Sequence, residues 1–375
     1  MSLFIDFKKA FDLVDSRLLL RKLGHYGFDN NSIYLLRSYF QNRSQVTKIE
    51  STKSSPLEIT MGVPQGSILG PLLFLIFINE LSYTLNIKNF LFADDTTIYD
   101  SASDFNTLVN KFNNSFKSVL DWISHNNLTI NWAKTKIMFL TNKNLKIPSS
   151  INICGSNVEV VTDFKLLGIQ IDKNLTFNKH LASLKKSVNT KLYSISKLFY
   201  LSYPIKTQFF KTFIQPHFDY CSSLAVYWSH TITKQIEKLF NNCISKLLKL
   251  NLFDKTVDDQ YLILNPLNIL PFKLRLFSNL CLFSHKILKN KILSEFKNGL
   301  SEKKNLYDLR DKPIFTVPRT RTKSGMRRFS VFLPNFVNQT LGYSYKLNFH
   351  DFKSFISSNI VLLFKQFPSN FKIFV

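Results

Sequence analysis

The sequence NFLFADDTTIYD (residues 89–100) places two adjacent carboxylates inside a β-prone apolar run. Aromatic and β-branched residues on both sides of the pair favour an extended chain. The run therefore predicts two strands joined by a tight turn at Asp94 and Asp95. Taken alone, the pair favours a turn in which backbone amides satisfy the carboxylates over the alternative of a metal site.

A third carboxylate interrupts another apolar run, SLFIDF, at the start of the chain. This run predicts a buried strand, and burying the charge of Asp6 in it is costly unless a partner compensates it. A shared divalent cation would compensate all three carboxylates, because hard cations such as Mg²⁺ bind oxygen ligands. Asp6, Asp94 and Asp95 are therefore candidate metal ligands.

The rest of the first 175 residues alternates between helical and strand patterns. Apolar spacing predicts a helix capped by Ser16, a second helix from Ser32 to about Phe40, and a long amphipathic helix over residues 105–125. Residues 41–60 alternate as in a hairpin, and FKLLGIQID (residues 164–172) reads as one strand.

Beyond about residue 180 the pattern is mostly helical, and the final sixty residues, with the basic stretch PRTRTKSGMRR, read as irregular. The composition thus predicts an α+β part followed by a helical part.

Positive charge is concentrated in the second half of the chain. Residues 1–175 hold 18 Lys and Arg against 15 Asp and Glu, a net of +3, whereas residues 176–375 hold 31 against 10, a net of +21. A lysine-rich genome would spread lysine over both halves. The asymmetry instead predicts that the second half binds a polyanion such as nucleic acid.

Cysteine usage and apolar runs bear on the compartment. The four cysteines lack CxxC spacing, which fits a reducing environment. Cys281 and His285 are four residues apart, and with no second pair nearby we expect core residues there and not a metal site. There is no signal-peptide pattern, and the longest apolar run, residues 68–78, is too short to cross a bilayer. We expect an intracellular protein of the nucleus or cytoplasm, neither secreted nor in a membrane.

Several motifs give the carboxylates a common context. FIDFKKAFD (residues 4–12), GVPQGSILGPLLF (62–74) and FADD (92–95) resemble, in order and spacing, motifs A, B and C of reverse transcriptases, especially those of non-LTR (LINE-like) retrotransposons. NLTINWAKTKIMFL (127–140) resembles motif D, and FKLLGIQID resembles motif E, the primer grip. The resemblance is strong over residues 1–175 and looser over residues 176 to about 300.

The resemblance implies a right-hand polymerase architecture within the α+β class. Residues 1–175 would form the palm, an antiparallel sheet backed by helices that carries motifs A to E. Residues 176–300 would form a mainly helical thumb-like region, and residues 301–375 a basic, partly irregular C-terminal region.

The implied activity is that of an RNA-directed DNA polymerase. Asp6, Asp94 and Asp95, with the backbone carbonyl of Phe7, would bind two Mg²⁺ ions, with Mn²⁺ as an alternative. Two such ions activate a primer 3′-hydroxyl and stabilise charge on the leaving pyrophosphate. The implied partners are an RNA template, a DNA primer and dNTPs, whereas protein partners are not readable from the sequence.

The resemblance also assigns a dNTP site. The ring of Phe11 would clash with a ribose 2′-hydroxyl, although a core role would also explain it. Gln65 and Gly66 would form a loop that approaches the nucleotide, with a plain helix-entry turn as the alternative. Lys134 would approach the pyrophosphate; Lys136 competes for this role, and an exposed strand lysine is the simple alternative.

Further positions would contact the primer–template. Leu167 and Gly168 would pack against the primer backbone. Four lysines of the second half are the expected phosphate contacts: Lys185, Lys186, Lys191 and Lys197.

The sequence departs from the family at its start, since only five residues precede Asp6, and we expect the fingers region of the family to be missing from it. We therefore expect the chain to be the downstream part of a longer element protein. Two functions stay open: a polymerase fragment, and a catalytically inactive remnant that binds nucleic acid. An RNA-dependent RNA polymerase shares the palm logic, but Phe11 argues against it.

Overall fold

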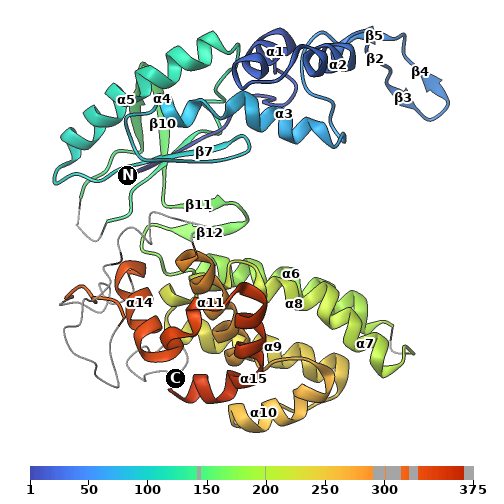
Figure 1. The fold of residues 1–375 in the computed structure, drawn as a ribbon, viewed down its shortest axis with the longest axis vertical. Helices are drawn as coiled ribbons and strands as arrows, with labels where there is room; N and C mark the ends of the chain where they lie inside the picture. Colours follow the sequence, from blue (N-terminus) through green and yellow to red (C-terminus); the bar gives the residue numbers. More distant parts are fainter. Residues whose placement is uncertain (142–144, 199, 290–299, 301–313, 321–327, 367–375) are drawn as a thin grey trace. The chain divides into compact units, whose positions relative to one another are not determined.

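The computed structural model describes residues 1–375 except 142–144, 199, 290–299, 301–313, 321–327 and 367–375. It divides the chain into two compact units, Met1–Phe164 and Lys165–Val375, which are described separately (Figure 1). Most of the basic stretch PRTRTKSGMRR lies outside the described residues. The boundaries drawn from the sequence for palm, thumb and C-terminal region stay predictions.

The first unit is built on one six-stranded sheet. Its strands are β1 (Ser2–Ile5), β6 (Asn89–Phe92), β7 (Asp95–Tyr99), β8 (Lys136–Met138), β9 (Ser150–Ile153) and β10 (Ser156–Val161), in the order β6-β7-β1-β8-β10-β9. The predicted antiparallel sheet is wrong for one pair, because β8 and β10 run parallel while the other pairs are antiparallel. The sheet is therefore mixed.

Helices accompany this sheet and share the first core with its strands and loops. They are α1 (Ser16–His25), α2 (Asn30–Phe40), α3 (Leu69–Ile78), α4 (Leu81–Thr84) and α5 (Phe105–His125). The long amphipathic helix is confirmed as α5, whose residues Phe112, Phe116 and Val119 are buried. In α1 the predicted cap Ser16 is wrong: the carboxylate of Asp15 accepts the Arg17 and Leu18 N–H groups, and Ser16 is the first helical residue.

Two short nested hairpins connect α2 to α3, which confirms the hairpin expected in residues 41–60. Strand β2 (Ser44–Gln45) pairs with β5 (Leu57–Glu58), and β3 (Lys48–Ile49) pairs with β4 (Thr52–Lys53).

The two strands β11 (Asp163–Leu166) and β12 (Ile169–Asp172) form a separate hairpin. The prediction of one continuous strand over FKLLGIQID is therefore wrong. Leu167 and Gly168 both take positive φ angles, 46° and 85°, which is the backbone of a two-residue hairpin turn.

The second unit is otherwise helical. Its α-helices are α6 (Asn178–Ser196), α7 (Tyr203–Phe209), α8 (Gln215–Asp219), α9 (His230–Leu248), α10 (Val257–Leu264), α11 (Phe272–Leu288), α14 (Phe329–Phe336) and α15 (Phe349–Gln366). Short π and 3₁₀ segments adjoin them: Phe210–Ile214, Ser222–Tyr227, Asn265–Leu267, Val337–Leu341 and Gly342–Lys346. The core is aromatic, with Phe240 in ring contact with Phe210, Phe218 and Phe272.

The structure of the second unit tests two predictions made from the sequence. Cys281 and His285 are fully buried on α11, and the imidazole contacts the Leu347 carbonyl through Nε2, which confirms their core role. The prediction of irregular structure for the last sixty residues is wrong, since α14 and α15 lie there. In the part of the chain that the structure describes, no helix has the length and apolarity needed to cross a membrane.

Candidate active site

The β6–β7 hairpin positions two of the three predicted carboxylates. Phe92 pairs with Asp95, so the two-residue turn consists of Ala93 and Asp94, one residue earlier than predicted, and Asp95 is the first residue of β7. Ala93 has a φ of 52°, in the left-handed region where a side chain is strained. Such strain, about 1–3 kcal/mol, persists only where the surrounding structure imposes it. The antiparallel pairing of β6 with β7 therefore fixes the direction in which Asp94 leaves the turn.

Asp6 reaches the same end of the sheet from the neighbouring strand. Ile5 pairs with Thr96, so continuing the antiparallel register by one step sets Asp6 opposite Asp95. The Asp6 backbone is held on its other side, because its N–H donates to Thr135 Oγ1 at 3.3 Å and its carbonyl accepts the Asn131 N–H at 2.7 Å.

The three carboxylates interact electrostatically. The pKa of Asp95 is raised above its ordinary value of 3.8, first by partial burial of its carboxyl group and then by the negative charges of Asp94 and Asp6. The residue as a whole is nevertheless exposed. Among the described residues, no three His, Cys, Asp or Glu side chains converge closely enough to hold an ion as they stand. No salt bridge between described residues engages any of the three carboxylates.

A cavity of about 570 Å³, here called the active-site cavity, opens beside these carboxylates. Most of the residues predicted for metal and dNTP binding line it together. The lining consists of Asp6, Phe7, Lys8, Lys9, Ala10, Phe11, Asp12, Leu13, Gln65, Asp94, Thr129, Asn131 and Lys134. Asp95 and Gly66 are not part of the lining.

The loop that begins at Gly62 is attached to the chain after Asp6. Gly62 N–H donates to the Val14 carbonyl at 2.8 Å, and Val63 N–H donates to the Phe11 carbonyl at 2.9 Å. A Cβ on Gly62 would lie 2.8 Å from the Asp12 carbonyl oxygen, and its φ is 89°. Only glycine satisfies both conditions.

Gln65 is oriented by a residue that the sequence did not single out. Its Nε2 donates to Asp12 Oδ1 at 2.7 Å, although the two residues are 53 positions apart. The available signal was the second aspartate of FIDFKKAFD, which lies in the cavity with Asp6.

Phe11 fits both interpretations given to it. Its ring stacks on that of buried Phe74 with 4.2 Å between centroids, so it is part of the core. The half-buried side chain also lines the active-site cavity.

The two candidate lysines differ in their surroundings. Lys134 is exposed and lines the cavity. Lys136 lies outside the lining, and its ammonium group binds Glu159 and the Ala133 carbonyl, each at 2.7 Å.

The predicted primer-grip residues form the tip of the β11–β12 hairpin. Tyr220, which the sequence reasoning did not select, donates from its hydroxyl to the Leu167 carbonyl at 2.5 Å, and its ring lies 3.4 Å from where a Gly168 Cβ would be. Tyr220 lies in HFDYCSS (residues 217–223), within the part of the chain where the resemblance to the family is looser.

The four predicted lysines in and directly after α6 differ in their side-chain contacts. Lys186 and Lys191 are exposed. Lys197 lies over the Tyr193 ring at 4.5 Å, and Lys185 donates to Gln235 Oε1 at 2.9 Å. A cavity of about 510 Å³ between α6 and α9 also contains two lysines that we did not predict, Lys238 and Lys246.

Comparison with known proteins identifies the first part of the chain. Residues 1–171 match the family described as reverse transcriptase (RNA-dependent DNA polymerase). These residues belong to the reverse transcriptase family. The resemblance drawn from the motifs is thereby confirmed for this domain, which combines a mixed sheet with helices.

The similar proteins come from mobile elements. The chain is 26% identical over 225 residues to the RNA-directed DNA polymerase from mobile element jockey of Drosophila melanogaster, covering 57% of this chain and 24% of that protein. It is 26% identical over 271 residues to the probable RNA-directed DNA polymerase from transposon X-element of the same species, covering 66% and 28%. The similarity thus spans about a quarter of the length of these relatives.

A solved structure of telomerase from Candida albicans, bound to a fragment of telomeric RNA, is also similar. It shares 13% identity at a TM-score of 0.30, covering 74% of this chain and 48% of that one. A similarity this low carries no argument about the fold.

Proposed function

We propose that this chain is part of a retrotransposon RNA-directed DNA polymerase that transfers deoxynucleotides from dNTPs to a primer 3′-hydroxyl on an RNA template. One observation carries the proposal: the active-site cavity gathers Asp6, Phe11, Gln65, Asp94 and Lys134 from four separate stretches of sequence. In this proposal the first unit is the palm and the helical second unit is the thumb-like region.

The donor set fits divalent cations, and we propose two Mg²⁺ ions. The carboxylates of Asp6, Asp94 and Asp95 would hold them. The pKa of Asp95 is raised first by partial burial and then by the neighbouring negative charges, which a cation would neutralise. Among the hydrogen bonds of the described residues, none uses the Phe7 carbonyl, which leaves it free as a ligand. With Mg²⁺ bound, the site gains Lewis-acid stabilisation of charge at the transferring phosphate.

The protein's own groups select and position the nucleotide. Stacking on Phe74 holds the Phe11 ring in place, where it would exclude a ribose 2′-hydroxyl. The hydrogen bond to Asp12 engages the amide nitrogen of Gln65 and leaves its oxygen to accept from the substrate or template. The Lys134 ammonium group would donate to the leaving pyrophosphate.

The second unit would hold the primer–template. The hairpin tip at Leu167 and Gly168 would contact the primer backbone, and the exposed Lys186, Lys191 and Lys197 would contact phosphates. We place Lys185 in the same surface, although Gln235 already accepts from it.

Primer extension on an RNA template with Mg²⁺ and dNTPs tests the proposal. The wild-type chain is expected to extend the primer. Asp94→Ala is expected to lose roughly 10²-fold or more, since misplaced reacting groups alone cost that much. Asp121→Ala, an exposed change on α5, serves as the control. Absence of extension by the wild-type chain would contradict the proposal.

The charge asymmetry favours a second candidate, a nucleic-acid-binding protein without turnover. It requires only the net charge of +21 in residues 176–375, from 31 basic and 10 acidic residues. Salt-sensitive binding of primer–template together with no extension by wild type or Asp94→Ala would select this candidate.

A further inference from the structure

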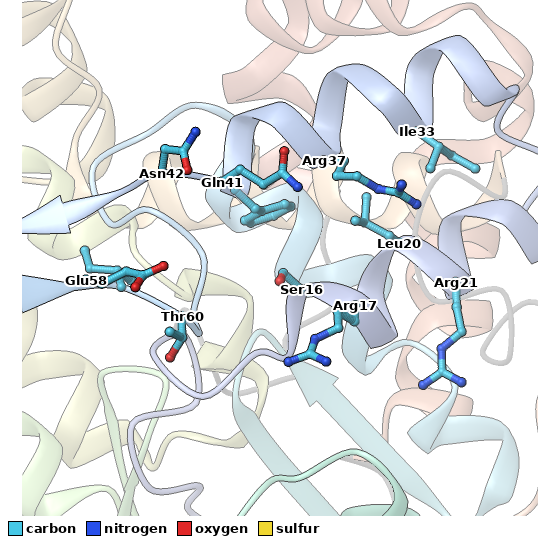
Figure 2. A pocket seen from close by; sticks show the side chains of 12 residues that line it. Ser16, Arg17, Leu20, Arg21, Ile33, Arg37, Gln41, Asn42, Glu58 and Thr60 are labelled. Atoms are coloured by element: carbon cyan, nitrogen blue, oxygen red, sulfur yellow. The ribbon is translucent and has the colours of Figure 1, made fainter.

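A second cavity of the first unit shares no residue with the active-site cavity. It encloses about 950 Å³ between α1, α2 and β5 (Figure 2), and we call it the arginine cavity. Its lining consists of Ser16, Arg17, Leu20, Arg21, Ile33, Arg37, Phe40, Gln41, Asn42, Glu58, Ile59 and Thr60. None of these residues lies in the motif A, B or C stretches that carry the proposed chemistry.

Three guanidinium groups make this cavity positively charged. Arg17 and Arg21 project from successive turns of α1, and Arg37 extends from the neighbouring helix α2 (Figure 2). Glu58 is the one carboxylate in the lining, and no salt bridge between described residues engages any of the three arginines. The cavity therefore carries an uncompensated positive charge of about two.

Within the part of the chain that the structure describes, no hydrogen bond or salt bridge engages these three guanidinium groups. The Arg37 guanidinium lies 5.5 Å from the Tyr34 ring, a contact that leaves its N–H donors available. Guanidinium groups bind phosphate through two parallel hydrogen bonds and are less strongly hydrated than ammonium groups. A surface that gathers three of them favours a ligand with several phosphates.

The remaining lining suits bases beside those phosphates. Phe40 contributes an aromatic ring to the lining, and bases stack on the faces of such rings with little sequence preference. Gln41 and Asn42 follow it with amide groups that can donate to and accept from base edges. A free inorganic phosphate would make no use of Phe40, Gln41 and Asn42, because it has no base to stack or to hydrogen-bond.

The size and position of the cavity limit the classes of ligand that it can bind. A concave site of this volume admits a few nucleotides of a single strand, whereas a duplex is bound by elements that enter its grooves. Thr60 at its edge precedes Gly62 by two residues and Gln65 by five. The polypeptide segment that leaves the arginine cavity at Thr60 thus continues directly into the loop that reaches the active-site cavity at Gln65.

We propose that the arginine cavity binds a single-stranded segment of nucleic acid through its phosphates. The site adds to the proposed polymerase function without depending on turnover. Its ligand chemistry, a phosphodiester chain with unpaired bases, is shared by RNA and DNA.

Binding of short labelled strands to the full chain tests this proposal. Fluorescence anisotropy with 12-nucleotide single-stranded RNA and DNA is measured between 50 and 200 mM salt, without Mg²⁺ or dNTPs. The variant Arg17→Gln/Arg21→Gln/Arg37→Gln is expected to lose roughly tenfold in affinity. Its log–log salt slope should fall by about 2, since each phosphate contact on a single strand contributes about 0.7.

A charge-matched control separates the cavity from the general basicity of the chain. Lys88, Lys117 and Lys146 are exposed residues of the same unit outside both cavities, and their triple change to Gln removes the same charge. This control is expected to change affinity less than twofold. Equal losses in the two triple variants would overturn the proposal.

Two further measurements keep the result interpretable. The variant Arg17→Lys/Arg21→Lys/Arg37→Lys retains the charge, so it should keep the salt slope while losing part of the affinity. In wild type, a photoreactive strand should crosslink to peptides holding residues 16–21 or 37–42, and crosslinks confined to other regions would overturn the proposal. A loss of affinity common to single-stranded RNA and DNA supports phosphate binding, and unchanged affinity for both contradicts it. Because turnover is not measured, failure here leaves the primer-extension result unaffected.

Discussion

At the scale of single residues, Asp95 connects the sheet to the proposed chemistry. Its raised pKa means that the folded chain holds this proton more tightly than the unfolded chain. Stability therefore falls as pH rises from about 3.8 through the raised pKa, and it stays lower above that window. The carboxylate that would bind a cation is a source of instability while no cation is present.

Asp95→Asn should remove this pH-dependent loss. Without divalent ions, the variant is expected to melt at a higher temperature than wild type at pH 7, with the difference shrinking towards pH 4. Thermal melts in a chelating buffer measure it, with Asp121→Asn on α5 as the control. If the two variants melt alike at pH 7, the charges of Asp6 and Asp94 do not act on Asp95 as described.

Gly62 allows a comparison between strain and close approach. Gly62→Ala places a Cβ 2.8 Å from the Asp12 carbonyl at a φ of 89°, whereas Gly27→Ala meets a similar φ of 88° with nothing within 4 Å. We expect Gly27→Ala to cost about 1–2 kcal/mol in unfolding free energy. Gly62→Ala should cost about 1–3 kcal/mol more through overlap. Denaturant unfolding measures both, and equal losses would contradict the close packing of this loop.

The site residues were only partly predictable from the sequence. Asp94 and Asp95 are adjacent, but the pair alone was ambiguous, and the order and spacing of the motifs were needed to connect it to Asp6 as a candidate metal site. The bond between Gln65 and Asp12 was not predictable, because it joins residues 53 positions apart through a backbone path that no local pattern specifies. The same holds for Tyr220, whose hydroxyl binds the Leu167 carbonyl.

At the scale of elements, the β11–β12 hairpin shows how local conformation decides topology. Its nine-residue stretch alternates like a strand, but Leu167 and Gly168 turn it back on itself. Tyr220, the C-cap residue of α8, holds the tip by donating a hydrogen bond to the Leu167 carbonyl. Its ring lies beside Gly168, 3.4 Å from where a Cβ would be. A proposed primer contact is thus positioned by the helical part of the same unit.

Tyr220→Phe should loosen this hairpin without unfolding the unit. The lost hydrogen bond is worth about 0.5–1.5 kcal/mol, towards the low end because the tyrosine is largely exposed. Hydrogen exchange at the amides of residues 166–170 is expected to speed up several-fold. Tyr193→Phe, whose ring lies under Lys197, should leave these amides unchanged. No change in the Tyr220 variant would show that the tip is held by other contacts.

At the scale of the whole chain, the secondary-structure class of each part was easier to predict from the sequence than the positions of its individual helices. An α+β first part and a helical second part follow from the period of the apolar residues. The terminal helix α15 was missed although Phe352, Ile356, Ile360 and Leu363 recur at helical spacing and are buried. The helix α14 was missed because Pro334 lies inside it and the basic stretch precedes it. Only packing against distant elements such as α11 reveals these helices as core.

Charge at this scale predicts a strong salt dependence. With a net charge of +24, the chain should bind primer–template with affinity that falls steeply as salt rises. Changing Lys186, Lys191 and Lys197 to Gln is expected to reduce the log–log slope by about 2, since each phosphate contact contributes about 0.7–0.9. Anisotropy titrations measure the slope, and an unchanged slope would place the phosphate contacts elsewhere.

The central claim is that the active-site cavity joins deoxynucleotides, and Phe11 tests it most directly. The measurement is single-nucleotide addition to a primer on an RNA template with Mg²⁺, comparing dNTP with NTP for wild type and Phe11→Ala. We predict that wild type adds the deoxynucleotide alone and that Phe11→Ala adds both, because the ring no longer blocks the 2′-hydroxyl. Addition of NTP by wild type, or discrimination unchanged in Phe11→Ala, would contradict the account.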